Sequence, residues 1–210
     1  MPGFLDRLFG RTPPPLTQEP EGAPLAELRE KIRAEVYGGF EDEDAILTGM
    51  PEYFEGTLDE ALVRREAPRL LRAALAEHAA DAARWPAITD CDRLDAAFDA
   101  LEAEGVIARQ NFTCCTTCGS AEIWDEMGEA REAGLPVEGY TFYHMQDTEA
   151  AVDGHGVYLA YGATEEGEEA ALAVARRVVA RLEASGLAPD WNGDIGRRIA
   201  VPLDWKRRRP

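Results

Sequence analysis

Residues 111–120 read Asn-Phe-Thr-Cys-Cys-Thr-Thr-Cys-Gly-Ser, between a run typical of a strand, 106–112, and a run typical of a helix, 121–133. The segment holds three of the four cysteines of the chain. We expect it to form a tight connection from the strand to the helix. The order of the elements on either side of this connection decides the fold.

The sequence on both sides continues to alternate between helix and strand patterns. Apolar residues that recur every three or four positions predict helices, whereas alternating or aromatic runs predict strands. The further elements expected are a helix at 89–105, strands at 140–145 and 157–161, a helix at 164–185 and a strand at 199–205. This β-α-β-β-α-β order predicts an α+β fold of the ferredoxin-like class, which is a split β-α-β arrangement.

Three parts are expected along the chain. Residues 1–20 include three consecutive prolines, which lack amide donors, and we expect a flexible tail there. Residues 21–88 are expected to be a helical region, because apolar residues such as Leu28 and Ile32 repeat at helical spacing. Residues 89–210 are expected to form the ferredoxin-like domain.

The composition excludes several classes of partner. The 22 Lys and Arg against 40 Asp and Glu give a formal net charge of −18, a field that repels nucleic acid and anionic lipid. No apolar run approaches the ~20 residues of a membrane span. We therefore expect an acidic, cytoplasmic protein whose partner is a protein or a small molecule, and neither nucleic acid nor a membrane. The basic residues 206–209 are expected to be a solvated tail.

Chain direction is expected to gather several metal-binding side chains at one sheet edge. The crossover through the helix at 121–133 makes the strands at 106–112 and 140–145 parallel, so both end at the same edge. The third strand starts there if it is antiparallel, and the helix at 89–105 begins on that side. The residues placed there are Cys91, Cys114, Cys115, Cys118, His144 and His155.

The Cys115-x-x-Cys118 pair with its neighbour Cys114 supports more than one interpretation. Zinc accepts thiolate and imidazole together, so the cluster is a candidate site for zinc or another soft metal, completed by one of the other three residues. Alternatively, a helix N-terminus lowers the pKa of Cys115, and Cys118 resolves it, as in a thiol-disulfide oxidoreductase. The cysteines could also pack as small hydrophobic side chains without any chemistry. No hydrolase or nucleotide-binding motif is recognised, and we favour a non-enzymatic binding or regulatory protein.

Several runs together resemble one family of proteins. These runs are 89–94, 111–119, 122–126, 139–149, 158–162 and 203–208. They are similar to an uncharacterised family of bacterial proteins, domain of unknown function 6891, over residues 89–209, and the helical region matches more loosely. The double cysteine beside the Tyr-His-x-Gln-Asp run at 143–147 is the most specific part. The resemblance implies no activity and no catalytic residue.

Overall fold

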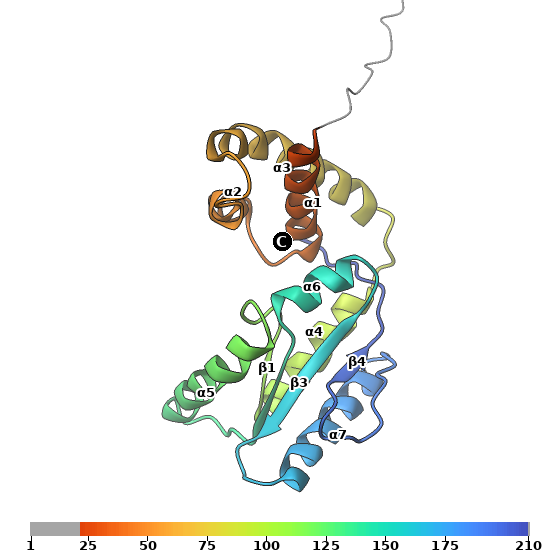
Figure 1. Cartoon of the computed structure of the whole chain (residues 1–210). Coiled ribbons are helices and arrows are strands. Elements are labelled where there is room, and N and C mark those ends of the chain that lie inside the picture. The colour runs from red at the N-terminus through yellow and green to blue at the C-terminus, as the bar shows by residue number, and fades with distance from the viewer. Residues whose placement is uncertain (1–21, 210) are drawn as a thin grey trace, which may run out of the picture.

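The structure of the chain is a computed structural model that describes residues 22–209 (Figure 1). The tail predicted at 1–20 therefore lies outside the described residues. The division into a helical region and an α+β part follows the order of the elements, and the domain boundary at residue 88 stays a prediction.

The first part of the chain is helical, as expected. It consists of α1 (Ala23–Gly38), α2 (Glu43–Tyr53) and α3 (Glu60–Ala82). Leu28, Ile32 and Val36 of α1 are completely buried, so the helical spacing of apolar residues does mark the inner face. Together with residues of α2 and α3 they form a hydrophobic cluster of their own.

The second part contains one mixed sheet and four helices. In chain order its elements are α4 (Asp90–Ala103), β1 (Val106–Arg109), α5 (Thr116–Glu132), β2 (Gly139–Phe142), α6 (Met145–Val152), β3 (Val157–Ala163), α7 (Glu168–Ala184) and β4 (Ile199–Val201). The strands lie in the order β1-β2-β3-β4, with β1 parallel to β2 and the other pairs antiparallel. The predicted α+β class and the parallel crossover from β1 to β2 are thus confirmed.

The ferredoxin-like topology is not confirmed. A split β-α-β unit leaves room for another strand between the two parallel strands that the helix connects. Here β1 and β2 are direct neighbours, and their register pairs Val106 with Gly139 and Arg109 with Phe142. The physical reason is that β3, the strand that a split unit places between β1 and β2, pairs with β2 on the side away from β1, and β4 follows at the edge beyond β3.

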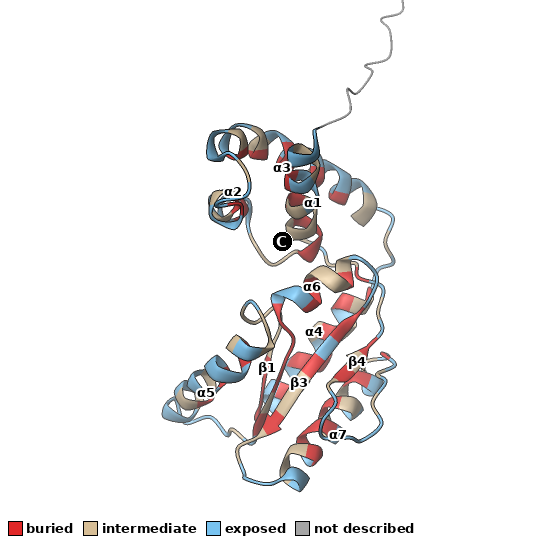
Figure 2. Ribbon diagram, viewed as in Figure 1, coloured by how far each residue is buried: buried red, intermediate tan, exposed pale blue. Residues whose placement is uncertain are grey.

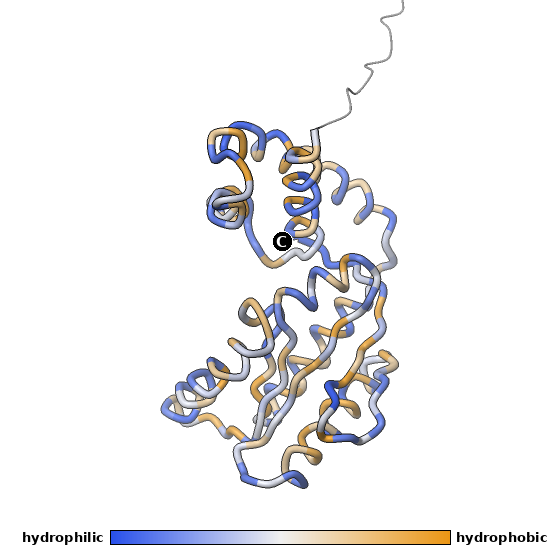
Figure 3. The backbone as a smooth tube through the Cα atoms, viewed as in Figure 1, coloured by the Kyte–Doolittle hydropathy of each residue, from blue (hydrophilic) through white to orange (hydrophobic). Residues whose placement is uncertain are grey.

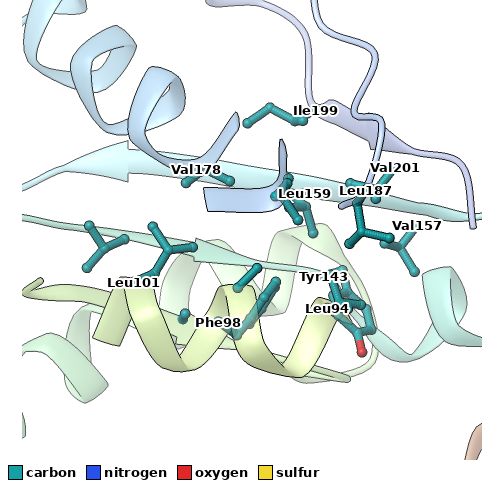
Figure 4. Packing of buried hydrophobic residues seen from close by; sticks show 14 of the residues in the cluster. Leu94, Phe98, Leu101, Tyr143, Val157, Leu159, Val178, Leu187, Ile199 and Val201 are labelled. Atoms are coloured by element: carbon teal, nitrogen blue, oxygen red, sulfur yellow. The ribbon is translucent and has the colours of Figure 1, made fainter. Parts of the chain in front are cut away.

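Helices cover both faces of the sheet. Because side chains alternate along a strand, Val106 and Ala108 face the cluster that α4 and α7 form, whereas Ile107 faces α5. Figure 4 shows Phe98 and Leu101 of α4 pointing toward the strands. The tube in Figure 3 alternates between hydrophilic and hydrophobic colours along the helices, as expected for helices with one buried face. Helix α5 is the more exposed cover (Figure 2).

The C-terminal segment lies between the two parts of the molecule, where Figure 1 marks the end of the chain beside α1. The prediction of a solvated basic tail at 206–209 is wrong. Arg207 is mostly buried and binds Asp95 of α4, while Arg209 donates to the main-chain oxygen atoms of Val36 and Glu41. A carboxylate of α4 and main-chain oxygen atoms near the end of α1 supply partners for these cations, and composition alone does not say where those partners lie.

Within residues 22–209, no helix combines the length and the apolar character that crossing a membrane requires.

Candidate metal centre

The cysteine loop and the end of β2 meet at one edge of the sheet, as the topology predicted. Beyond the strands, the amide of Phe112 donates to the carbonyl oxygen of Tyr143 at 2.9 Å, and the amide of Met145 donates to that of Thr113 at 3.0 Å. These bonds continue the parallel pairing of β1 and β2 into the loop. The backbone before the cysteines is therefore held against the start of α6.

Two residues of this loop have a left-handed backbone. Asn111 has φ 51° and Thr113 has φ 58°, and for a β-branched residue such as threonine this conformation is strained. Side-chain hydrogen bonds hold both residues in place: Thr148 Oγ1 donates to Asn111 Oδ1 at 2.7 Å, and Thr113 Oγ1 donates to the oxygen of Cys115 at 3.2 Å. These left-handed conformations turn the chain sharply before Cys114, which lies just ahead of the start of α5.

Three cysteines surround the N-terminus of α5. The helix begins at Thr116, five residues earlier than predicted, so that Cys115 is the N-cap and Cys118 lies in the first turn. The Sγ atoms of Cys114, Cys115 and Cys118 all lie within 4.8 Å of one another, and those of Cys114 and Cys118 are 3.4 Å apart. All three are free thiols; Cys114 is exposed and the other two are half-buried. The three sulfur atoms could hold one metal ion.

Hydrogen bonds at the start of α5 shift the pKa values of Cys115 and Cys118 in opposite directions. Hydrogen bonding from the backbone amide of Cys118, together with the Cys118 side chain and the amide of Thr117, lowers the pKa of Cys115 below its ordinary value. Hydrogen bonding to Cys114 and Cys115 raises the pKa of Cys118 to about 11. Cys115 is therefore the first of these two thiols to ionise as pH rises.

Gly119 brings the cysteine turn close to the sheet. A Cβ atom at this position would lie 2.5 Å from Cε2 of Phe142, whose side chain is completely buried. Because the ring has no room to move, only glycine permits this separation between α5 and β2. The residue that follows Cys118 in the sequence thus lets the first turn of α5 approach the sheet closely.

Replacing Gly119 with alanine is expected to lower the free energy of unfolding by about 1–3 kcal/mol, because the added methyl group overpacks a filled site. Gly128 of the same helix is the matched control, because a Cβ there meets nothing within 4 Å. Gly128→Ala is expected to stabilise the protein by up to about 1 kcal/mol, the gain in helix propensity. Urea denaturation followed by circular dichroism measures both, and equal stability of the two variants would contradict the close approach.

His144 lies at the same edge of the sheet but is held by other partners. It is the N-cap of α6, where its Nδ1 accepts from the amide of Asp147 at 3.2 Å. Its Nε2 lies 3.1 Å from a carboxylate oxygen of Asp147, which also binds Arg198 at 3.0 Å. Burial lowers the pKa of His144, although the Asp147 carboxylate acts in the opposite direction. The ring is thus a neutral cap, and it is not in the group of three sulfur atoms.

Cys91 and His155 are not in that group either. Cys91 is buried and its Sγ accepts from the amide of Lys206 at 3.3 Å, while burial raises its pKa to about 11. His155 is exposed in the loop before β3. Among the described residues, the structure therefore brings together Cys114, Cys115 and Cys118 from the six residues predicted.

The sequence interpretation missed the partners that occupy His144. Asp147 follows it by three residues, which is the spacing of a capping box and could have identified the histidine as an N-cap. Arg198 lies 51 residues beyond Asp147, and no sequence signal connects the two. The left-handed conformations of Asn111 and Thr113 also had no signal other than the preference of asparagine for such positions.

Comparison with known proteins gives a family and no activity. The family model described as Domain of unknown function (DUF6891) matches residues 21–209 of the chain. The searches of curated proteins and of solved structures found no match.

Proposed function

The chain belongs to the family described as Domain of unknown function (DUF6891), and from this premise we propose that it is a non-enzymatic binding or regulatory protein. Its ligand is zinc or another soft metal, bound by Cys114, Cys115 and Cys118. The observation that carries the proposal is the group of three sulfur atoms within 4.8 Å of one another. Thiolates select zinc and copper(I) over hard cations such as magnesium and calcium.

The spacing of the sulfur atoms supports a shared metal ion. Zinc–sulfur bonds of about 2.3 Å in a tetrahedral site place two sulfur ligands about 3.8 Å apart. The Sγ atoms of Cys114 and Cys118 are 3.4 Å apart, which is close to that value. The other sulfur–sulfur distances are at most 4.8 Å, about 1 Å longer than a shared zinc ion requires. Small rotations of the side chains around a half-exposed turn are enough to complete the geometry.

Three protein ligands leave one coordination position for another molecule. Two of the residues predicted as a fourth ligand have other partners: Cys91 accepts from the amide of Lys206, and His144 lies beside Asp147. The third, His155, is exposed in the loop before β3. Structural zinc sites have four protein ligands, whereas sites with three accept water or an exchangeable ligand. We therefore assign the site to reversible binding or sensing of a metal rather than to stabilising the fold.

Burial argues against the interpretation that these cysteines only pack. Buried cysteines behave as small hydrophobic side chains, and Cys91 fits that description at 1% exposure. Cys114 is exposed, and Cys115 and Cys118 are half-buried. Three adjacent, accessible thiols contribute little to a core, which favours a chemical role.

The remaining parts of the proposal concern partners and location. The formal net charge of −18 supports a protein or small-molecule partner and disfavours nucleic acid and anionic membranes. Free thiols in close contact need a reducing compartment to stay reduced, which supports a cytoplasmic location.

Metal titration of the full chain under reducing conditions tests the proposal. One equivalent of zinc is expected to bind and to release protons, because thiols must lose their protons to become ligands. Cobalt(II) in the same site is expected to give the intense near-ultraviolet absorption of cobalt–thiolate bonds. Protein that takes up no zinc after reduction, or cobalt that binds without that absorption, would rule out the cysteine site.

The lowered pKa of Cys115 favours one alternative, a thiol-disulfide oxidoreductase that uses Cys115 and Cys118. The Cys115 thiolate would attack a substrate disulfide and release one substrate thiolate. The Cys118 thiolate would then attack the mixed disulfide, leaving a Cys115–Cys118 disulfide and a fully reduced substrate. An external thiol would reduce the protein again.

The pH dependence of alkylation tests this alternative. For the metal-free protein, the rate of Cys115 alkylation by iodoacetamide is expected to reach half its maximum at a lower pH than for the peptide 111–120, because the thiolate is the reactive form. Cys118, with a pKa of about 11, is expected to lag behind it. Mass spectrometry of the digested protein separates the sites. A Cys115 midpoint at or above that of the peptide would remove the basis of the redox alternative.

A further inference from the structure

A cleft of about 690 Å³ lies between the helical region and the α+β part of the molecule. Helices α1 and α2 form one wall and α6 the other, and Asn111 and Cys114 of the cysteine loop contribute to its lining. Small-molecule sites commonly have volumes of about 300–1,000 Å³ and lie where two parts of a protein meet. We refer to this feature as the α2–α6 cleft.

Part of the lining of the α2–α6 cleft is apolar. Phe40, Met50, Tyr53 and Met145 line it from three different segments of the chain. Tyr53 is 58% exposed and Met145 is 42% exposed, so both present apolar surface to the cleft. Methionine side chains adapt to the shape of a bound molecule, so these walls suit an apolar ligand body.

The charges around the cleft select the sign of the ligand. Four carboxylates line it, Glu35, Glu41, Glu52 and Glu149, against one ammonium group, that of Lys31. Lys31 forms ion pairs with Glu35 and Glu149, so its charge is already used. The carboxylates of Glu41 and Glu52 have no ion pair within residues 22–209; Arg209 contacts Glu41 at its main-chain oxygen and not at its carboxylate. A cationic ligand would complete this arrangement.

An aromatic ring of the cleft already holds a cation. The Nζ atom of Lys31 lies 4.4 Å from the centroid of the Tyr53 ring, a distance typical of a cation–π interaction. The Tyr53 ring is thus compatible with a positive charge nearby.

We propose that the α2–α6 cleft binds a small organic cation, whose apolar body packs against Tyr53 and Met145 and whose protonated nitrogen pairs with Glu41 and Glu52. The proposal does not require a metal ion at the cysteines, although Cys114 belongs to both sites. Its test uses the full chain, reduced and free of metal, so a failure of one proposal leaves the other unaffected.

The test compares three probes of the same shape. 4-Phenylbutylamine carries a positive charge, 4-phenylbutan-1-ol is neutral, and 4-phenylbutanoate is negative. Isothermal titration is expected to give an affinity for the amine about tenfold higher than for the alcohol, the effect of one charge-assisted hydrogen bond, and weaker binding still of the carboxylate. Equal affinities for the three probes, or no binding of the amine up to about 10 mM, would overturn the proposal.

Two glycines provide a matched pair of variants that locate the binding. Gly49 lines the cleft, and Gly128 lies on α5 away from it; a Cβ at either position meets nothing within 4 Å. Gly49→Trp is expected to fill the cleft and weaken amine binding at least about tenfold, whereas Gly128→Trp leaves it unchanged. Both remove a glycine from a helix and are expected to fold. Unchanged binding by Gly49→Trp would place the amine elsewhere and refute the proposal.

Charge variants test the role of the carboxylates. The pair Glu41→Gln with Glu52→Gln is expected to reduce the preference for the amine over the alcohol by about tenfold. The control pair, Glu43→Gln with Glu55→Gln, changes net charge equally at exposed positions outside the cleft and is expected to retain the preference. Equal losses in both pairs would mean that overall charge, and not the cleft, selects the cation.

Discussion

Replacing Cys114, Cys115 or Cys118 with serine is expected to weaken zinc binding by more than about 100-fold for each substitution. Loss of a residue that only hydrogen-bonds to a metal ligand can lower metal affinity by up to about 100-fold, and loss of a thiolate ligand itself lowers it further. Competition with a chromophoric chelator measures the affinity of each variant. The three losses are expected to be similar, because each sulfur atom belongs to the same group.

Cys91→Ala, His144→Asn and His155→Asn are the controls for these variants. Each removes a side chain that can bind metal but is not in the group of three sulfur atoms. Cys91 lies in the core and His144 caps α6, so the first two variants are expected to lose stability while retaining zinc affinity. A loss of affinity in either histidine variant that matches the cysteine losses would mean that the site extends beyond the loop.

Replacing Arg207 with alanine is expected to lower the free energy of unfolding by about 3 kcal/mol, the order of magnitude for removing one member of a largely buried ionic network. Its guanidinium donates to Asp95 at 2.6 Å and to Gln110 at 2.7 Å, and it lies 4.5 Å from the centroid of the Phe40 ring. Its main-chain oxygen lies 2.9 Å from Nε2 of His78. One residue thereby connects both parts of the molecule.

The control for Arg207 is Arg197, which forms an exposed pair with Asp194 at 4.0 Å. Arg197→Ala is expected to change stability by less than about 0.5 kcal/mol, as is usual for exposed ion pairs. Arg207→Lys keeps the charge without the planar fork and is expected to recover only part of the loss. Urea denaturation of the three variants measures the differences. An Arg207→Ala variant as stable as Arg197→Ala would show that the C-terminal segment does not hold the two parts together.

Much of the fold was predictable because it depends on local patterns. The spacing of apolar residues such as Leu28 and Ile32 marked the buried face of α1, and the helix expected at 89–105 is present as α4. The crossover from β1 to β2 was correctly predicted to be parallel, since two strands joined through a helix usually share a direction. That one inference brought the cysteine loop and His144 to the same edge of the sheet.

The candidate site was predictable only to the level of the loop. Cys114, Cys115 and Cys118 are adjacent in sequence, and a short turn before a helix is sufficient to bring them together. His144 could join the metal site only if its ring had no other hydrogen-bond partner. Asp147 and Arg198 occupy it, and Arg198 arrives from a distant part of the chain.

By itself the sequence determined most of the helices, the direction of the first two strands and the clustering of three thiols, because each depends on interactions between residues close along the chain or on one crossover. Only the tertiary structure decided that β4 pairs with β3, that Arg207 is buried and that a cleft lies beside Cys114. Those features depend on which distant surfaces pack together. That choice reflects the total of many small packing and ionic terms across the whole chain, and no single stretch of sequence encodes it.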